Sequence, residues 1–164
     1  MALNQSDLAK GIQQMPEPQG AEVLSVKAKF TVTPASAMVL EVGQLPVGCV
    51  PCDWIIDSDD LDTGTTVTFD FGILVAAKTS VDTGATSGGA AWLAASPLAQ
   101  AGGVVRPVSK ATFRTAERTS TPTGDTPAAA QLRSVGLAFT GTFAGAQSGD
   151  IEVTLFYRAS QNGN

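Results

Sequence analysis

Alternation of apolar and polar residues with a period of two constrains the fold of this chain more than any other feature of its sequence. The clearest example lies in residues 67–75, where every second residue is apolar: Val67, Phe69, Phe71, Ile73 and Val75. Thr66, Thr68 and Asp70 alternate with them. Because successive side chains of a β-strand point to opposite faces, this pattern predicts a strand with one face in a core and the other in water.

The same pattern returns in five other segments, so the chain is predicted to be all-β. These segments are residues 21–33, 37–42, 50–57, 135–143 and 151–158. The last two flank a turn at 144–149 and are expected to form a hairpin. Residues 104–108 and 110–114 predict two weaker strands, and residues 91–101 predict a short helix around Trp92. With no long helical period between the strands, the expected fold is an antiparallel β-sandwich or jelly roll.

The predicted strands form one domain, residues 21–160, with long Gly/Thr-rich loops and a polar tail at residues 161–164. Residues 1–20 are predicted to be an extended N-terminal arm, because they are polar and rich in proline near their end. Two outcomes stay open for this arm: a disordered terminus, or a segment that becomes ordered by docking on a neighbour. Its apolar residues Leu8 and Ile12 are the candidates for such a contact.

The chain of 164 residues contains no histidine. This removes the usual general base, the Ser–His and Cys–His nucleophile pairs and the commonest metal ligand, so the chain is not expected to be an enzyme. The formal net charge of −5 argues against binding to nucleic acid. No apolar run approaches the length that crosses a bilayer, so no membrane contact is expected, and the N-terminus does not read as a secretory signal.

Two motifs carry candidate chemistry. Cys49 and Cys52 form a CxxC pair, but the pair enters a strand, and no second pair or histidine completes a zinc site. Both are interpreted as small apolar residues. The second motif is an acidic turn whose carboxylates are candidate Ca²⁺ ligands, namely Asp57, Asp59, Asp60 and Asp62. Because these residues do not follow the order of ligand positions in an EF-hand loop, the favoured interpretation is a hydrogen-bonded turn. No metal and no cofactor are expected.

Basic residues and one tryptophan in the second half of the chain are further interface candidates. Half of the ten basic residues lie between positions 106 and 133, namely Arg106, Lys110, Arg114, Arg118 and Arg133. They predict either a patch that meets an acidic partner or scattered solvated charge. Trp92 is expected either to pack in the core, which is favoured, or to anchor an interface.

The order of several turns in the chain resembles a known family. Residues 39–75 contain Gly43-Gln-Leu-Pro-Val-Gly48, then the acidic Asp57–Asp62, then a Thr-rich strand that ends in Gly72-Ile-Leu. A later segment, Ala90–Ser96, leads to Gln100-Ala-Gly-Gly103. This arrangement resembles small structural proteins of tailed bacteriophages that are encoded beside the major capsid protein and taken to be head decoration, or cement, proteins. The resemblance spans residues 21–110 and carries no catalytic residue.

The resemblance implies a small β-sandwich or jelly-roll module that binds the outer surface of the phage head and stabilises the lattice of the major capsid protein. It implies that the chain is made in the cytoplasm of the bacterial host, associates with itself as a dimer or trimer, and ends on the capsid surface of the virion. Two alternatives stay open. One is another virion component, such as a tail or head–tail connector protein. The other is a carbohydrate-binding β-sandwich, whose stacking aromatics would be Trp54, Trp92 and Tyr157.

Overall fold

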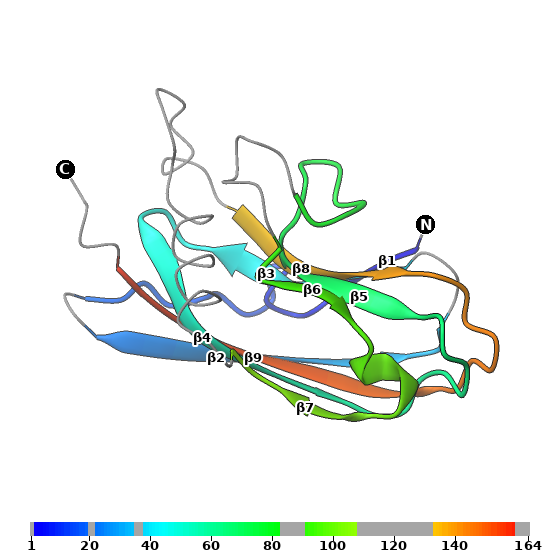
Figure 1. The fold of residues 1–164 in the computed structure, drawn as a ribbon. Coiled ribbons are helices and arrows are strands. Elements are labelled where there is room, and N and C mark those ends of the chain that lie inside the picture. Colours follow the sequence, from blue (N-terminus) through cyan, green and yellow to red (C-terminus); the bar gives the residue numbers. More distant parts are fainter. Residues whose placement is uncertain (1, 20–21, 35–37, 83–90, 108–132, 160–164) are drawn as a thin grey trace.

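A computed structural model of the chain contains two β-sheets that pack face to face (Figure 1). It describes residues 2–19, 22–34, 38–82, 91–107 and 133–159. The strands are β1 (Ala2–Gln5), β2 (Val23–Val32), β3 (Met38–Leu45), β4 (Cys49–Ser58), β5 (Thr68–Ile73), β6 (Leu93–Ser96), β7 (Gly103–Val105), β8 (Arg133–Thr140) and β9 (Gly149–Ala159). The five-stranded sheet has the order β1-β3-β8-β5-β6, and the four-stranded sheet has the order β2-β9-β4-β7. The predicted all-β sandwich is confirmed.

The core lies between the two sheets and follows the alternation seen in the sequence. On β2, for example, every second residue from Val26 to Val32 is buried, and the residues between them are exposed. Aromatic rings join the sheets: Trp54 on β4 packs against Phe71 on β5 and against Trp92, with ring centroids 5.8 Å apart in both pairs. Aromatic pairs of this kind contribute about 0.5–1.5 kcal/mol each beyond the area that they bury.

The predicted hairpin of the two C-terminal strands is wrong. β8 lies between β3 and β5 in one sheet, whereas β9 lies between β2 and β4 in the other. Their connection therefore crosses from one sheet to the other. Two backbone hydrogen bonds hold it against residues 61–63: Thr63 N–H donates to Gly145 O at 3.2 Å, and Gln147 N–H donates to Leu61 O at 2.9 Å. Both strands turn an apolar face to the same core. The alternation determines that face, but it does not determine which strand lies alongside.

The predicted helix at residues 91–101 is also wrong. Leu93–Ser96 forms the edge strand β6 beside β5, and only Leu98–Gln100 turns, as a single 3-10 helix. Pairing with β5 outweighs the helical propensity of this Ala-rich segment, since Trp92 N–H donates to Phe71 O at 2.8 Å. The weak strand predicted at 104–108 corresponds to β7, which pairs with β4.

Several predicted segments lie outside the described residues. They are the weak strand at 110–114, most of the Gly/Thr-rich loops at 78–91 and 115–130, and the polar tail at 161–164.

The N-terminal segment, residues 2–19, packs on its own domain. β1 pairs in parallel with β3, from Ala2 opposite Met38 to Gln5 opposite Glu41. Further along, Leu8 is buried and Met15 packs against the core. The sequence left open a disordered terminus or an arm on a neighbour, whereas here the segment completes one edge of the chain's own five-stranded sheet.

Gly43 on β3 allows the N-terminal segment to approach this closely. A Cβ atom at Gly43 would lie 2.9 Å from the sulfur of Met15 and 3.3 Å from Cβ of Leu8. The pairing of β3 with β8 also shifts register between Glu41 and Gly43. A larger residue at this position would require the side chains of Met15 and Leu8 to shift.

Candidate interaction surface

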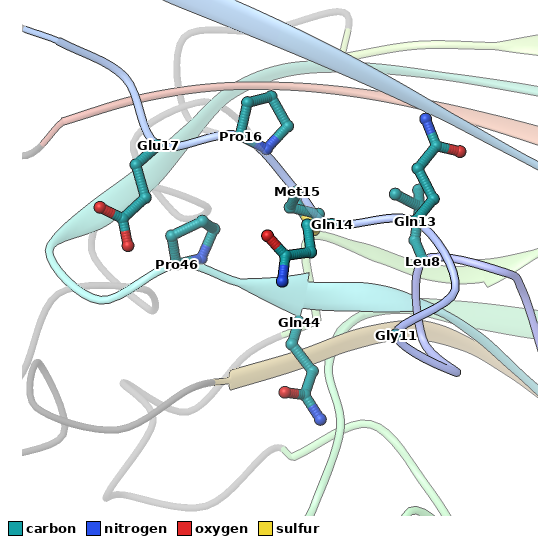
Figure 2. A pocket seen from close by; sticks show the side chains of 9 residues that line it. All are labelled: Leu8, Gly11, Gln13, Gln14, Met15, Pro16, Glu17, Gln44 and Pro46. Carbon is teal, nitrogen blue, oxygen red and sulfur yellow. The ribbon is translucent and has the colours of Figure 1, made fainter.

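A groove of about 620 Å³ lies between the N-terminal segment and the end of β3 (Figure 2). Its lining residues are Leu8, Gly11, Gln13, Gln14, Met15, Pro16, Glu17, Gln44 and Pro46. In Figure 2, Gln13 to Glu17 run beside the end of β3, which carries Gln44 and is followed by Pro46. The lining combines apolar surface with glutamine carboxamides, which both donate and accept hydrogen bonds.

Tyr157 fixes one wall of this groove. Its hydroxyl, at the end of β9, donates a hydrogen bond to the carbonyl oxygen of Pro16 at 2.6 Å. The ring is fully buried, and burial raises the pKa of Tyr157 to about 12. The phenol therefore stays protonated and able to donate throughout the physiological range.

Large apolar side chains are exposed beside the groove. Ile12 is 73% exposed and lies in the chain between the groove residues Gly11 and Gln13. Val47 is 51% exposed and follows Pro46.

A buried carboxylate, Glu41, holds the N-terminal strand against the sheet. Its side chain is 0% exposed. Gln5 Nε2 donates to its Oε2 at 2.6 Å, Ser134 Oγ donates to its Oε1 at 2.7 Å, and Lys78 Nζ lies 2.7 Å from the same Oε1. Burial alone would raise the pKa of Glu41, but the hydrogen bonds from Lys78, Ser134 and Gln5 outweigh it and hold the pKa below its ordinary value.

The Glu41 network connects four parts of the chain, because Gln5 belongs to β1, Ser134 to β8 and Lys78 to the turn that follows β5. Lys78 adopts a left-handed backbone conformation, with φ of 53°, in that turn. Glu41 was not among the candidates predicted from the sequence. The available signal was a charged residue inside the apolar run from Val39 to Val42.

The interface candidates that the structure describes lie in different parts of the molecule. Leu8 is 6% exposed and Trp92 is 2% exposed, so both belong to the core of this chain. Ile12 is exposed beside the groove. Arg106 is exposed directly after β7, the edge strand of the four-stranded sheet, and its Nη2 lies 2.5 Å from Oδ2 of Asp53. The candidates Lys110, Arg114 and Arg118 lie outside the described residues.

The acidic turn is fastened by hydrogen bonds. It contains Asp57, Asp59, Asp60 and Asp62, which were candidate calcium ligands, although a turn without metal was favoured. Oδ2 of Asp59 accepts from Asp150 N–H at 2.8 Å, and Oδ1 of Asp60 accepts from Asp62 N–H at 3.2 Å. Asp62 is buried, and its Oδ1 accepts from Gly145 N–H at 2.7 Å. Within the described ranges, no three His, Cys, Asp or Glu side chains are arranged to hold a metal ion.

Cys49 and Cys52 are free thiols at the start of β4. Burial raises the pKa of both thiols, so both are neutral near pH 7. Neutral thiols are poor nucleophiles and poor metal ligands, in agreement with their interpretation as small apolar residues.

The three aromatic residues expected to stack in a carbohydrate site, Trp54, Trp92 and Tyr157, are buried. None of the helical structure in the described residues is long and apolar enough to span a membrane.

Comparison with solved structures places the chain among phage capsid chains. A chain in the structure "Capsid of Ralstonia phage GP4" is 35% identical, with a TM-score of 0.72, and the match covers 99% of this chain and 100% of that chain. A chain in "Cyanophage Pam1 capsid asymmetric unit" is 23% identical, with a TM-score of 0.50 over 88% of this chain and 91% of that one, which shows a shared fold. No protein-family model and no curated protein matches the sequence.

Proposed function

The chain belongs to the family of the chain solved in the capsid of Ralstonia phage GP4, a family of structural proteins of the virion, and we propose that within this family it is a decoration, or cement, protein. In this role it binds the outer surface of the phage head and stabilises the lattice of the major capsid protein. The observation that carries the proposal is 35% identity over the full length of a capsid chain. A subunit that binds only the assembled lattice stabilises that lattice by mass action.

The contact surface in this proposal is the groove together with Ile12 and Val47. Its occupant is an extended segment of the major capsid protein. The carboxamides of Gln13, Gln14 and Gln44 offer donors and acceptors that match those of a peptide backbone, and Met15 and Pro16 offer apolar surface for its side chains.

Sedimentation with purified capsids tests the proposal. The chain is mixed with phage heads before and after shell expansion, and bound protein is measured in the pellet. We expect binding to the expanded shell and a higher temperature of shell disruption. If the chain binds neither form, the decoration role is wrong.

A pair of matched variants tests the proposed contact surface. Ile12→Asp places a charge beside the groove, and Val104→Asp places one on β7, where Val104 is also exposed. Ile12→Asp should weaken binding by about tenfold or more, because it buries an unpaired charge in the interface, and Val104→Asp should leave it nearly unchanged. Equal effects of the two variants would rule out the groove as the contact surface.

Copy number separates the decoration role from a tail or connector role. A shell protein is expected in roughly hundreds of copies per virion, whereas a connector that forms a closed ring is expected in about six or twelve. Quantitative mass spectrometry of purified virions gives this number. Self-association as a dimer or trimer belongs to the same proposal, and analytical ultracentrifugation of the free chain tests it.

A further inference from the structure

Among the described residues the two sheets have four edge strands, and three of them are short or distorted. β1 has four residues and β7 has three. β6 has four and is distorted at Ala95, where φ is 49° and the backbone N–H donates to Asp70 Oδ1 at 2.8 Å. Short and distorted edges of this kind hinder the addition of a further strand.

The fourth edge strand, β2, is long and regular. It has ten residues, and it pairs with β9 from Val23 opposite Arg158 to Val32 opposite Gly149 without a register shift. No other described strand pairs with β2, and no backbone hydrogen bond from elsewhere in the described residues reaches it. The second side of β2 is therefore an open edge in the part of the chain that the structure describes.

The hydrogen bonds of Asp150 on β9 show which residues of β2 face the open edge. Asp150 N–H donates to Asp59 Oδ2 and its carbonyl oxygen accepts from Asp59 N–H, so both backbone groups point to the side of β4. Because this direction alternates along a strand, the odd-numbered residues of β9 bond to the even-numbered residues of β2 that lie opposite them. The odd-numbered residues of β2, among them Ser25, Lys27 and Lys29, therefore direct N–H and C=O outward, and their side chains are also exposed.

A cleft of about 370 Å³ lies beside this edge. It is lined by residues 3–5 of β1, by residues 29–32 of β2 and by Lys10. Lys29 pairs with Asp150 at 2.7 Å, whereas no carboxylate of the described residues lies within ion-pair distance of the exposed Lys10. A carboxylate that enters the cleft from an added strand would gain a charge-assisted hydrogen bond there.

The lysines of β2 argue against a second copy of this chain as the added strand. In an antiparallel pairing of two β2 strands, odd-numbered residues lie opposite odd-numbered residues, because their backbone groups are the ones that face outward. A pairing centred on Lys27, or between Lys27 and Lys29, places lysines directly opposite lysines. Like charges in this arrangement are destabilising, so the edge favours an acidic strand of another protein.

We propose that the open edge of β2 receives an extended acidic segment of the major capsid protein, which adds a fifth strand to the four-stranded sheet. The segment bonds through its backbone to the outward groups of Ser25, Lys27, Lys29 and Thr31, and one of its carboxylates enters the cleft beside Lys10. The inference rests on the proposed function and adds to it a second contact besides the groove, in which recognition depends on backbone pairing.

The matched variants Ser25→Pro and Ser25→Ala test the strand addition. Proline removes the outward N–H of an exposed edge residue, and alanine keeps it. In sedimentation with expanded capsids, Ser25→Pro should weaken binding by about fivefold or more, because a carbonyl group of the added strand loses its donor. Ser25→Ala should change binding by less than about twofold. Both variants should keep a urea midpoint close to that of the wild type, because the N–H of Ser25 does not bond to β9.

The variant Lys10→Glu tests the carboxylate. It changes an exposed side chain of the cleft and should weaken capsid binding by about fivefold or more, because two carboxylates then face each other. The control Arg106→Glu makes the same change in net charge beside β7, at the opposite edge of the four-stranded sheet. It should change binding by less than about twofold.

The outcomes separate this inference from the proposed function. A large fall in the urea midpoint of Ser25→Pro would show that another part of this same chain occupies the edge, and the inference would be wrong. Self-association of the wild type that Ser25→Pro abolishes would also overturn it, because the occupant would then be a second copy. Unchanged capsid binding by Ser25→Pro would overturn the strand addition, and unchanged binding by Lys10→Glu would overturn the carboxylate, while the decoration role stays intact. A wild-type chain that binds no capsid would overturn the inference and the decoration role together.

Discussion

Replacing Glu41 with glutamine removes the charge at the centre of the network that joins β1, β3, β8 and the turn after β5. The substitution keeps the shape of the side chain. It leaves the Lys78 ammonium, whose side chain is 27% exposed, without its carboxylate, and it turns one acceptor oxygen into a donor that faces other donors.

Breaking one partner of a buried ion pair costs about 3–5 kcal/mol. Because Lys78 keeps contact with water, we expect a loss of about 3 kcal/mol, at the lower end of this range. This is a large part of the stability of a typical domain, which is about 5–15 kcal/mol. For a domain of this size it lowers Tm by about 6–12 °C.

Urea denaturation followed by tryptophan fluorescence measures this loss. The matched control is Glu152→Gln, which breaks the pair of Glu152 with Lys27, N–O distance 2.6 Å, on the surface of the sheet. That exposed pair should contribute only about 0.2–1 kcal/mol. The double variant Glu41→Gln with Lys78→Met should recover part of the loss, since it removes the unpaired charge as well.

The pH dependence gives an independent check. The pKa of Glu41 is lower in the folded chain than in the unfolded chain, so the folded state binds fewer protons at this site. Its contribution is therefore fully present above the unfolded pKa of about 4.3 and is lost as the pH falls through the lower folded pKa. The stability gap between the wild type and Glu41→Gln should close in acid. A Glu41→Gln variant within about 0.5 kcal/mol of the wild type at pH 7 would refute this account of the network.

Three further predictions concern the N-terminal segment and the thiols. Tyr157→Phe removes the hydrogen bond to Pro16 O and should cost about 1 kcal/mol, with faster proteolysis within residues 2–19 as the second readout. Gly43→Ala places a Cβ 2.9 Å from the sulfur of Met15 and should lower the free energy of unfolding by about 1–3 kcal/mol. A urea midpoint equal to that of the wild type would contradict the close packing. Cys49 and Cys52 are free with raised pKa values, so a reductant should leave Tm unchanged, and labelling by a thiol reagent at pH 7 should be slow until the chain unfolds.

The strands that are half-buried were predictable, because burial of one face leaves the alternation seen on β2, β5 and β9. Their neighbours were not predictable, because the same alternation fits any strand that faces the same core. β6 was missed since its sequence, Leu-Ala-Ala-Ser, has no alternation, and its backbone pairing with β5 determines its conformation.

The candidate surface was predictable only in part. Ile12 was named because it is apolar in a polar segment, and it is exposed beside the groove. The other wall of the groove comes from Gln44 and Pro46, which reach it only through the folding of β3 against the N-terminal segment. Arg133 was named as one of several basic residues, but the burial of its Nε and Nη1 depends on tertiary contacts that no local pattern encodes.

The central place of β9 has a consequence for how the chain is made. β9 lies between β2 and β4, and it pairs Arg158 with Val23 at one end and Gly149 with Val32 at the other. During synthesis, β2 and β4 leave the ribosome long before the strand that joins them, so the four-stranded sheet cannot close until residues 149–159 have emerged. The four-stranded sheet, and the hydrogen bond from Tyr157 of β9 to the carbonyl oxygen of Pro16, therefore form only on chains that have been translated through β9.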